Sequence, residues 1–129
     1  MRRIFGFILA VSVVAVSCNK EAGEGGTSSI TGTILVNDFD GSGVFQEQYL
    51  GQDEDVYIIY GTADQTYDDN FSTSHDGTFR FDYLTPGDYT IFAYSRCDTC
   101  AGGQEAIKRT VNVADKKTEY TVGTIEISK

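Results

Sequence analysis

The sequence predicts an all-β fold, a single antiparallel β-sandwich of about seven strands. Apolar residues alternate with polar ones from Ile30 onward, whereas no segment shows the 3.6-residue period of a helix. Short turn signals rich in Gly, Asp or Pro separate the alternating runs. The chain has 129 residues, of which 40% are hydrophobic and 12% aromatic, enough for one ordered domain with a modest core.

Each expected strand is a short run with apolar residues at every second position. In chain order, these runs cover residues 30–36, 56–60, 79–81, 89–93, 107–113 and 120–127, and a weaker one lies near 70–73. The turn signals are Asp40-Gly41-Ser42-Gly43, Asp76-Gly77, Pro86-Gly87 and Gly102-Gly103. Runs of this length and spacing are typical of a sandwich, in which each strand buries one of its faces.

The N-terminal segment indicates export. Two arginines precede the uncharged stretch Ile4–Val16, which is shorter than the roughly 20 apolar residues of a membrane span. Such a stretch is typical of the hydrophobic region of a signal peptide. Ala15-Val16-Ser17-Cys18 resembles the lipobox of bacterial lipoproteins. This resemblance implies a signal peptide over residues 1–17 and acylation of Cys18; the alternative is a secreted protein that is cleaved elsewhere.

Residues 18–29 are then expected to be the lipidated cysteine and a flexible, Gly- and Ser-rich tether. No Asp follows Cys18, and Lys20-Glu21 resembles the surface-export signal of Bacteroidetes lipoproteins. The expected location is therefore the cell envelope, at the outer membrane or the cell surface. The acyl chains would provide the membrane attachment, because two or three chains anchor a protein firmly.

The formal net charge of −9 bears on the class of partner. Nucleic-acid binding requires a basic surface for the phosphates, so the sequence argues against it. Anionic lipid headgroups would also repel the domain, which leaves membrane attachment to the acyl chains.

The segment Ser74–Ile91 carries a more specific pattern. It contains Asp76-Gly77, then Phe79-x-Phe81, then Leu84-x-Pro86-Gly87-x-Tyr89. This order resembles the carboxypeptidase regulatory-like, transthyretin-like (prealbumin-like) β-sandwich family. The resemblance implies a sandwich over residues 30–129, with Tyr89 placed as in a tyrosine corner, and an accessory module without catalysis. Residues 41–55 depart from the pattern, being long and acidic where many members have a short connection.

Cys97 and Cys100 form the most informative pair of reactive side chains. If Cys18 is acylated, these two cysteines remain, in a compartment where disulfides persist. A loop disulfide is the favoured interpretation. A redox pair would need a helix after Cys97 to lower its pKa, and a zinc site would need two more ligands; a metal site, a redox pair and free thiols remain the alternatives.

Asp38, Asp40 and Glu47 form an acidic loop with the oxygen ligands that calcium prefers. Their spacing does not match an EF-hand, because Val36 occupies the first ligand position. A solvated turn is the favoured interpretation, and an irregular calcium site is the alternative.

Phe92 and Tyr94 alternate with Ile91 and Ala93, which allows them to face away from the core. Cover from the second sheet is the favoured interpretation, and an exposed aromatic strip is the alternative. Exposed aromatic side chains on a sheet can stack on sugar rings or bind a protein. The sequence therefore predicts a non-catalytic envelope lipoprotein, a binding or scaffolding module for an envelope protein or a polysaccharide. It predicts no cofactor, and the alternative function is a redox or metal-binding protein that uses Cys97 and Cys100.

Overall fold

The computed structural model describes residues 22–62 and 66–129. The signal peptide over residues 1–17 and Cys18 lie outside these residues. The elements are β1 (Glu24–Phe39), β2 (Phe45–Leu50), β3 (Asp55–Tyr60), β4 (Asp69–Ser72), β5 (Thr78–Leu84), β6 (Gly87–Arg96), the 3₁₀ turn η1 (Ala101–Gly103), β7 (Gln104–Val113) and β8 (Glu119–Ser128). In the described residues, no helix combines the length and apolar character that crossing a membrane requires.

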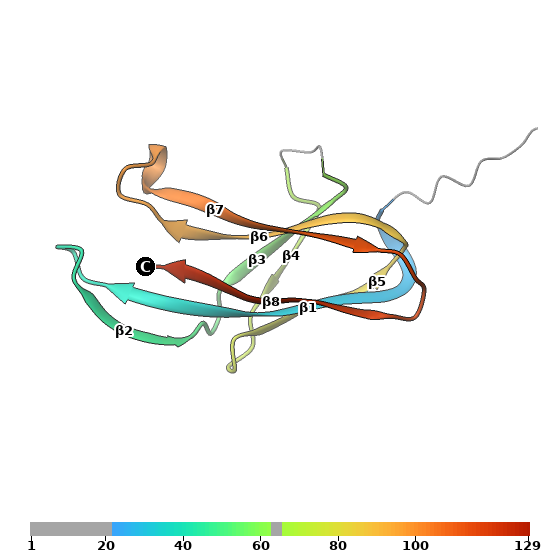
Figure 1. Ribbon diagram of the computed structural model, residues 1–129, viewed down its shortest axis with the longest axis horizontal. Helices are drawn as coiled ribbons and strands as arrows, with labels where there is room; N and C mark the ends of the chain where they lie inside the picture. The colour runs from blue at the N-terminus through green and yellow to red at the C-terminus, as the bar shows by residue number, and fades with distance from the viewer. Residues whose placement is uncertain (1–21, 63–65) are drawn as a thin grey trace, which may run out of the picture.

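Two four-stranded sheets pack face to face, which confirms the predicted sandwich (Figure 1). The second sheet is antiparallel throughout, in the order β4-β3-β6-β7. The first sheet is built around β1. Strands β5 and β2 pair antiparallel with successive parts of one edge of β1, while β8 pairs in parallel with the other edge. The parallel pair arises because β8 follows the second sheet in the chain and returns to the first sheet in the direction of β1.

The apolar alternation points into the space between the sheets, as predicted. The buried side chains are Ile30, Ile34, Val36, Val56, Ile58, Phe79, Phe81, Leu84, Tyr89, Ile91, Ala93, Val113, Ile125 and Ile127. Every predicted run contributes to this core or packs against it. The inward position between Ile30 and Ile34 is Gly32, which leaves room for the ring of Phe79.

Tyr89 forms the corner expected from the resemblance. Its ring is fully buried, and its hydroxyl donates a hydrogen bond of 2.6 Å to the Thr85 carbonyl, four residues earlier. The same hydroxyl accepts a hydrogen bond of 2.9 Å from the backbone N–H of Gly23. One side chain thus closes the β5–β6 turn and fixes the point at which the chain enters the domain.

The expected tether over residues 18–29 is too long. Strand β1 begins at Glu24, and Ser28 and Ser29 are buried. The small residues of this segment allow the backbone to approach β5 closely, since a Cβ at Gly26 would overlap the Leu84 carbonyl. The same glycine and serine content that indicates flexibility therefore permits a tightly paired strand here.

The acidic segment 41–55 contains a strand that raises the total to eight. Strand β2 pairs with β1 from Leu35↔Leu50 to Phe39↔Phe45, with a bulge after Asp38. All of its residues are exposed, so neither of its faces required an apolar row that the sequence could display. The weaker run near residues 70–73 is strand β4, of which Phe71 packs against the core.

Candidate functional site

Aromatic side chains gather on the outer face of the second sheet. Strand β6 supplies Phe92 and Tyr94, β3 supplies Tyr57, and the segment before β4 supplies Tyr67. We call these residues the aromatic face. Tyr57 is central, with its ring centroid 5.1 Å from that of Phe92, 5.5 Å from that of Tyr94 and 4.6 Å from that of Tyr67. The face exists because the inward residues of these strands alternate with outward aromatic ones.

Burial divides the aromatic face into a base and a surface. Phe92 is only 5% exposed, because Tyr57 stacks on it at an interplanar angle of 20° and Tyr94 meets it edge-on. Tyr67 and Tyr94 are 48% and 42% exposed. Phe92 and Tyr94 lie on the outer face of the second sheet, so the cover of Phe92 comes from its own sheet and not from the other one. Phe92 therefore supports the rings above it and is not open to a ligand.

Polar groups continue the row across the sheet. Directly opposite residues share a face, and the pairing places Asn70, Tyr57, Phe92 and Lys108 side by side on β4, β3, β6 and β7. At the end of β3, Ser72 donates a 3.0 Å hydrogen bond to Asp55. An amide, a hydroxyl, a carboxylate and an ammonium therefore border the exposed rings.

The phenol of Tyr57 is held in its neutral form. Burial raises its pKa above the ordinary value, and the nearby Asp55 carboxylate adds to the effect. The centre of the aromatic face is thus uncharged, whereas its margins are polar. Such a surface combines stacking area with hydrogen-bonding groups that can fix an orientation.

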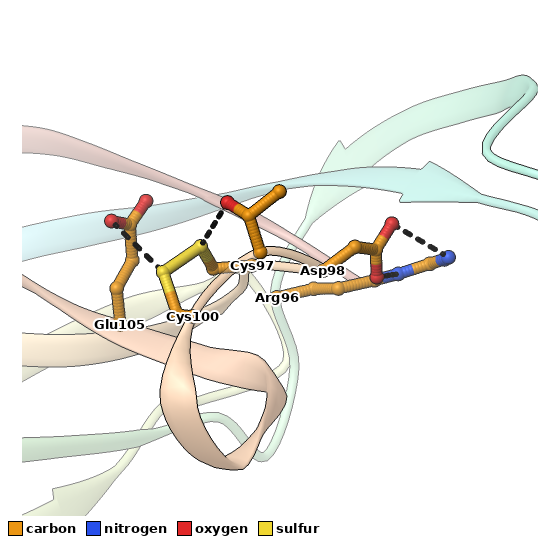
Figure 2. Close-up of a disulfide and its surroundings, with 6 residues drawn as sticks. Arg96, Cys97, Asp98, Cys100 and Glu105 are labelled. Carbon is orange, nitrogen blue, oxygen red and sulfur yellow. Dashed lines mark hydrogen bonds and ion pairs between the residues drawn. A yellow bond between two sulfur atoms is a disulfide. The ribbon is translucent and has the colours of Figure 1, made fainter.

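The β6–β7 hairpin carries the disulfide Cys97–Cys100, as the favoured interpretation predicted (Figure 2). Three backbone hydrogen bonds of 2.9–3.2 Å hold the turn from Cys97 to Gly103. Arg96 precedes it and forms a 2.9 Å ion pair with Asp98. Cys97 and Cys100 therefore form a disulfide within a turn that is also held by backbone hydrogen bonds.

Glu105 is a neighbour of the disulfide that sequence reasoning missed. One of its carboxylate oxygens lies 4.0 Å from the Cys100 sulfur (Figure 2). Cys97, Cys100 and Glu105 are the one group of three metal-ligating side chains that the described part of the chain brings within 4.8 Å of one another. A structural zinc site needs four ligands, so this group falls one short even when the cysteines are reduced. Glu105 could have been found by pairing the two strands of the hairpin around the Cys97–Cys100 turn, because this pairing brings the start of β7 alongside the end of β6.

The carboxylates of the acidic loop are spread over the turn and the two strands beside it. The side chain of Asp40 is used by its own turn, where it accepts hydrogen bonds of 2.8 and 2.9 Å from the Ser42 and Val44 amides. Asp38 and Glu47 lie opposite each other on β1 and β2. In the described residues, these three carboxylates do not form a compact ligand group. The favoured interpretation of a solvated turn therefore fits the geometry better than calcium binding.

An open groove with a volume of about 530 Å³ lies mainly over the outer face of the first sheet, and Thr31, Thr33 and Thr121 help to line it. Arg80 borders it but is already paired with Asp82 at 2.5 Å and with Glu119 at 3.0 Å. The Arg80 guanidinium also donates a hydrogen bond to Ser29. The groove is polar, and Arg80 is already engaged in ion pairs. The aromatic face is therefore the better candidate for ligand recognition.

Comparison with known proteins adds little to this geometry. No protein-family model matches the chain, and no curated protein matches it. Among solved structures, it is similar to a "putative carbohydrate binding protein" from Pseudomonas aeruginosa, with 15% sequence identity and a TM-score of 0.48. That alignment covers 84% of this chain and 92% of the other.

Proposed function

We propose that this protein is a non-catalytic binding module of the cell envelope and that its aromatic face binds a glycan. The single observation that carries the proposal is the arrangement of Tyr57, Tyr67 and Tyr94 above the buried ring of Phe92. Sugar rings present flat C–H surfaces that pack on aromatic rings, and their hydroxyls need hydrogen-bonding partners. Asn70 and Lys108 lie in the same row and supply such partners.

The support from Phe92 gives the aromatic face a fixed centre on which a sugar ring can stack. Tyr57 is fixed by its stacking on Phe92, so little side-chain entropy remains to be lost at the centre of the aromatic face when a ligand binds. Tyr67 and Tyr94 flank Tyr57 and retain exposed area for contact. A sugar chain lying across the strands would contact aromatic rings and polar groups together.

Anchoring is the second part of the proposal. We infer that Cys18 is acylated and that the domain is held at the outer membrane or cell surface by a short linker. The hydrogen bonds of Tyr89 to Gly23 and Thr85 support a fixed junction between this linker and the domain. Labelled palmitate incorporated by the bacterial host should appear on the natural chain and be lost with Cys18→Ser.

The glycan proposal is tested with a glycan array, followed by calorimetry with the best oligosaccharide. The chain would carry Cys18→Ser so that no acyl group is attached. Tyr94→Ala is expected to weaken binding by about tenfold, or about 1.4 kcal/mol, and Tyr67→Ala by a similar amount. Both residues are exposed, so the free energy of unfolding should change little in either variant.

Tyr49→Ala is the matched control, because Tyr49 is 38% exposed but lies on β2 in the other sheet. It should leave glycan binding unchanged. A cross-linked protein partner that depends on Tyr94, together with an empty glycan array, would show that the aromatic face binds protein instead. Equal losses with Tyr49→Ala and Tyr94→Ala would rule the aromatic face out as the site.

A further inference from the structure

Strand β2 presents a free edge. It pairs with β1 along one side, and within the described residues no strand pairs with its other side. All of its residues are exposed, and it lies at the margin of the first sheet (Figure 1). An unpaired edge is a template for another extended segment, and natural proteins commonly protect it with Lys or Pro, neither of which occurs in β2.

The register shows which backbone groups are available. The Gly51 amide donates a 2.8 Å hydrogen bond to the Ile34 carbonyl, so the alternation of an antiparallel ladder directs Tyr49 and Glu47 toward β1. The N–H and C=O groups of Gln48 and Leu50 then point outward. These two residues would form the hydrogen bonds to an added strand.

The outer face of this edge carries two apolar pairs, with Gln48 hydrogen-bonded to Asn37 between them. Leu35↔Leu50 and Phe39↔Phe45 are directly opposite pairs, and the odd-numbered residues of β1 alternate with the buried Ile34 and Val36. Phe45 and Leu50 therefore lie on the outer face of the sheet, where they are 54% and 50% exposed. Phe45 also meets Phe39 edge-on, with ring centroids 5.7 Å apart. An added strand would place apolar side chains beside Phe45 and Leu50.

The opposite face carries two neighbouring carboxylates, of which Asp38 is attracted electrostatically by the Arg96 guanidinium. Asp38 and Glu47 are directly opposite each other, and like charges in this position are destabilising. Among the ion pairs of the described residues, none involves either carboxylate. A cation on the inner face of an added strand would lie beside Glu47 and relieve this repulsion.

We propose that the free edge of β2 binds an extended segment of a partner protein in which apolar residues alternate with Lys or Arg. The segment adds a strand to the first sheet. Its apolar side chains pack beside Phe45 and Leu50, and its cations lie beside Glu47. This surface is in the sheet opposite the aromatic face, so the two proposals stand independently.

The test uses a short blocked peptide of alternating valine and lysine, with the full chain carrying Cys18→Ser, in buffer containing EDTA. Binding should be saturable and should slow hydrogen exchange at the Gln48 and Leu50 amides. Glu47→Gln should weaken the affinity for the peptide by about fivefold. Asp115→Asn is the matched control: it removes one exposed carboxylate in the β7–β8 connection and should leave the affinity unchanged.

Two further peptides separate strand pairing from general charge attraction. A valine–glutamate peptide should not bind, and N-methylation of alternate backbone amides in the valine–lysine peptide should abolish binding. Unchanged exchange at Gln48 and Leu50 under saturating peptide would overturn the proposal. Protection of β2 that rises with protein concentration alone would also overturn it, because the occupant would then be a second copy of this chain.

Discussion

Gly32 shows how a single residue sets the packing of the core. It occupies an inward position of β1, where a Cβ would overlap the Phe79 ring and approach Val122 to 2.7 Å. Phe79 is 2% exposed and is itself enclosed by the core, so it has little room to move. The absence of a side chain at Gly32 therefore leaves room for the Phe79 ring, which reaches across from the neighbouring strand β5 of the same sheet.

Gly32→Ala is expected to destabilise the domain by about 1–3 kcal/mol through overpacking. Urea denaturation followed by circular dichroism would measure the change. Gly41→Ala is the control, because a Cβ at that exposed turn position has no neighbour within 4 Å. If both variants had the same stability, the contact of Gly32 with Phe79 would not limit the packing.

Tyr60 makes the folding stability of the protein depend on pH in the alkaline range. Burial and the Glu24 carboxylate, which accepts a 3.2 Å hydrogen bond from the phenol, raise the Tyr60 pKa well above its model-compound value of 10.0. The folded state therefore holds this proton more tightly than the unfolded chain. The resulting stabilisation is fully present below pH 10 and is lost as the pH rises through the folded pKa.

Absorbance titration of the phenolates should accordingly contain a late-ionising component. Tyr60→Phe should remove that component and reduce the fall in stability above pH 10. Because Tyr60→Phe also removes the hydrogen bond to Glu24, Glu24→Gln is the companion variant and should shift the late component toward lower pH. An unaltered titration curve in Tyr60→Phe would contradict the assignment.

At the scale of the strand, the geometry of the β6–β7 hairpin indicates how much the disulfide contributes to the stability of the fold. The loop closed by Cys97 and Cys100 is very short, with a sequence separation of 3. The turn is also held by backbone hydrogen bonds from Cys97 to Gly103 and back to Cys100. A short loop removes little entropy from the unfolded chain, so the cross-link should stabilise modestly.

Replacing Cys97 and Cys100 together by Ser should cost about 2 kcal/mol or less and should leave the sandwich folded. Thermal unfolding of both proteins, with and without reductant, would measure this loss of stability. Reductant should lower the melting temperature of the parent chain and leave the double variant unchanged. Global unfolding on reduction would instead show that the hairpin governs the whole domain.

Strands that bury one face could be predicted from the sequence, and β2 could not. Val56 and Ile58 alternate with half-buried or outward residues because β3 has an inner and an outer side. Strand β2 has both sides exposed, so only its backbone pairing to β1 defines it. The cover of Phe92 was the favoured interpretation, but its source could not be predicted, since it comes from Tyr57 on a strand that is distant in sequence.

At the scale of the whole molecule, the two proposed recognition surfaces lie on different sheets. The aromatic face lies on the outer side of the second sheet, and the free edge of β2 belongs to the first. Neither surface uses Gly23 or Tyr89, which form the junction where the chain enters the domain. A glycan and a protein strand could therefore be bound at the same time without competing for the same side chains.

The parallel pairing of β1 and β8 also determines how the domain responds to mechanical force. The chain enters beside Glu24, and Lys129 lies at the far end of β1, where its carbonyl accepts a hydrogen bond from Phe39. Tension between these ends acts along the strands and loads the ladder from Ser29 to Asn37 in shear, with its hydrogen bonds sharing the load. A hairpin pulled from its open end would break these bonds one after another. A domain held between a membrane and a load at its C-terminal end would therefore resist extension until the whole ladder fails together.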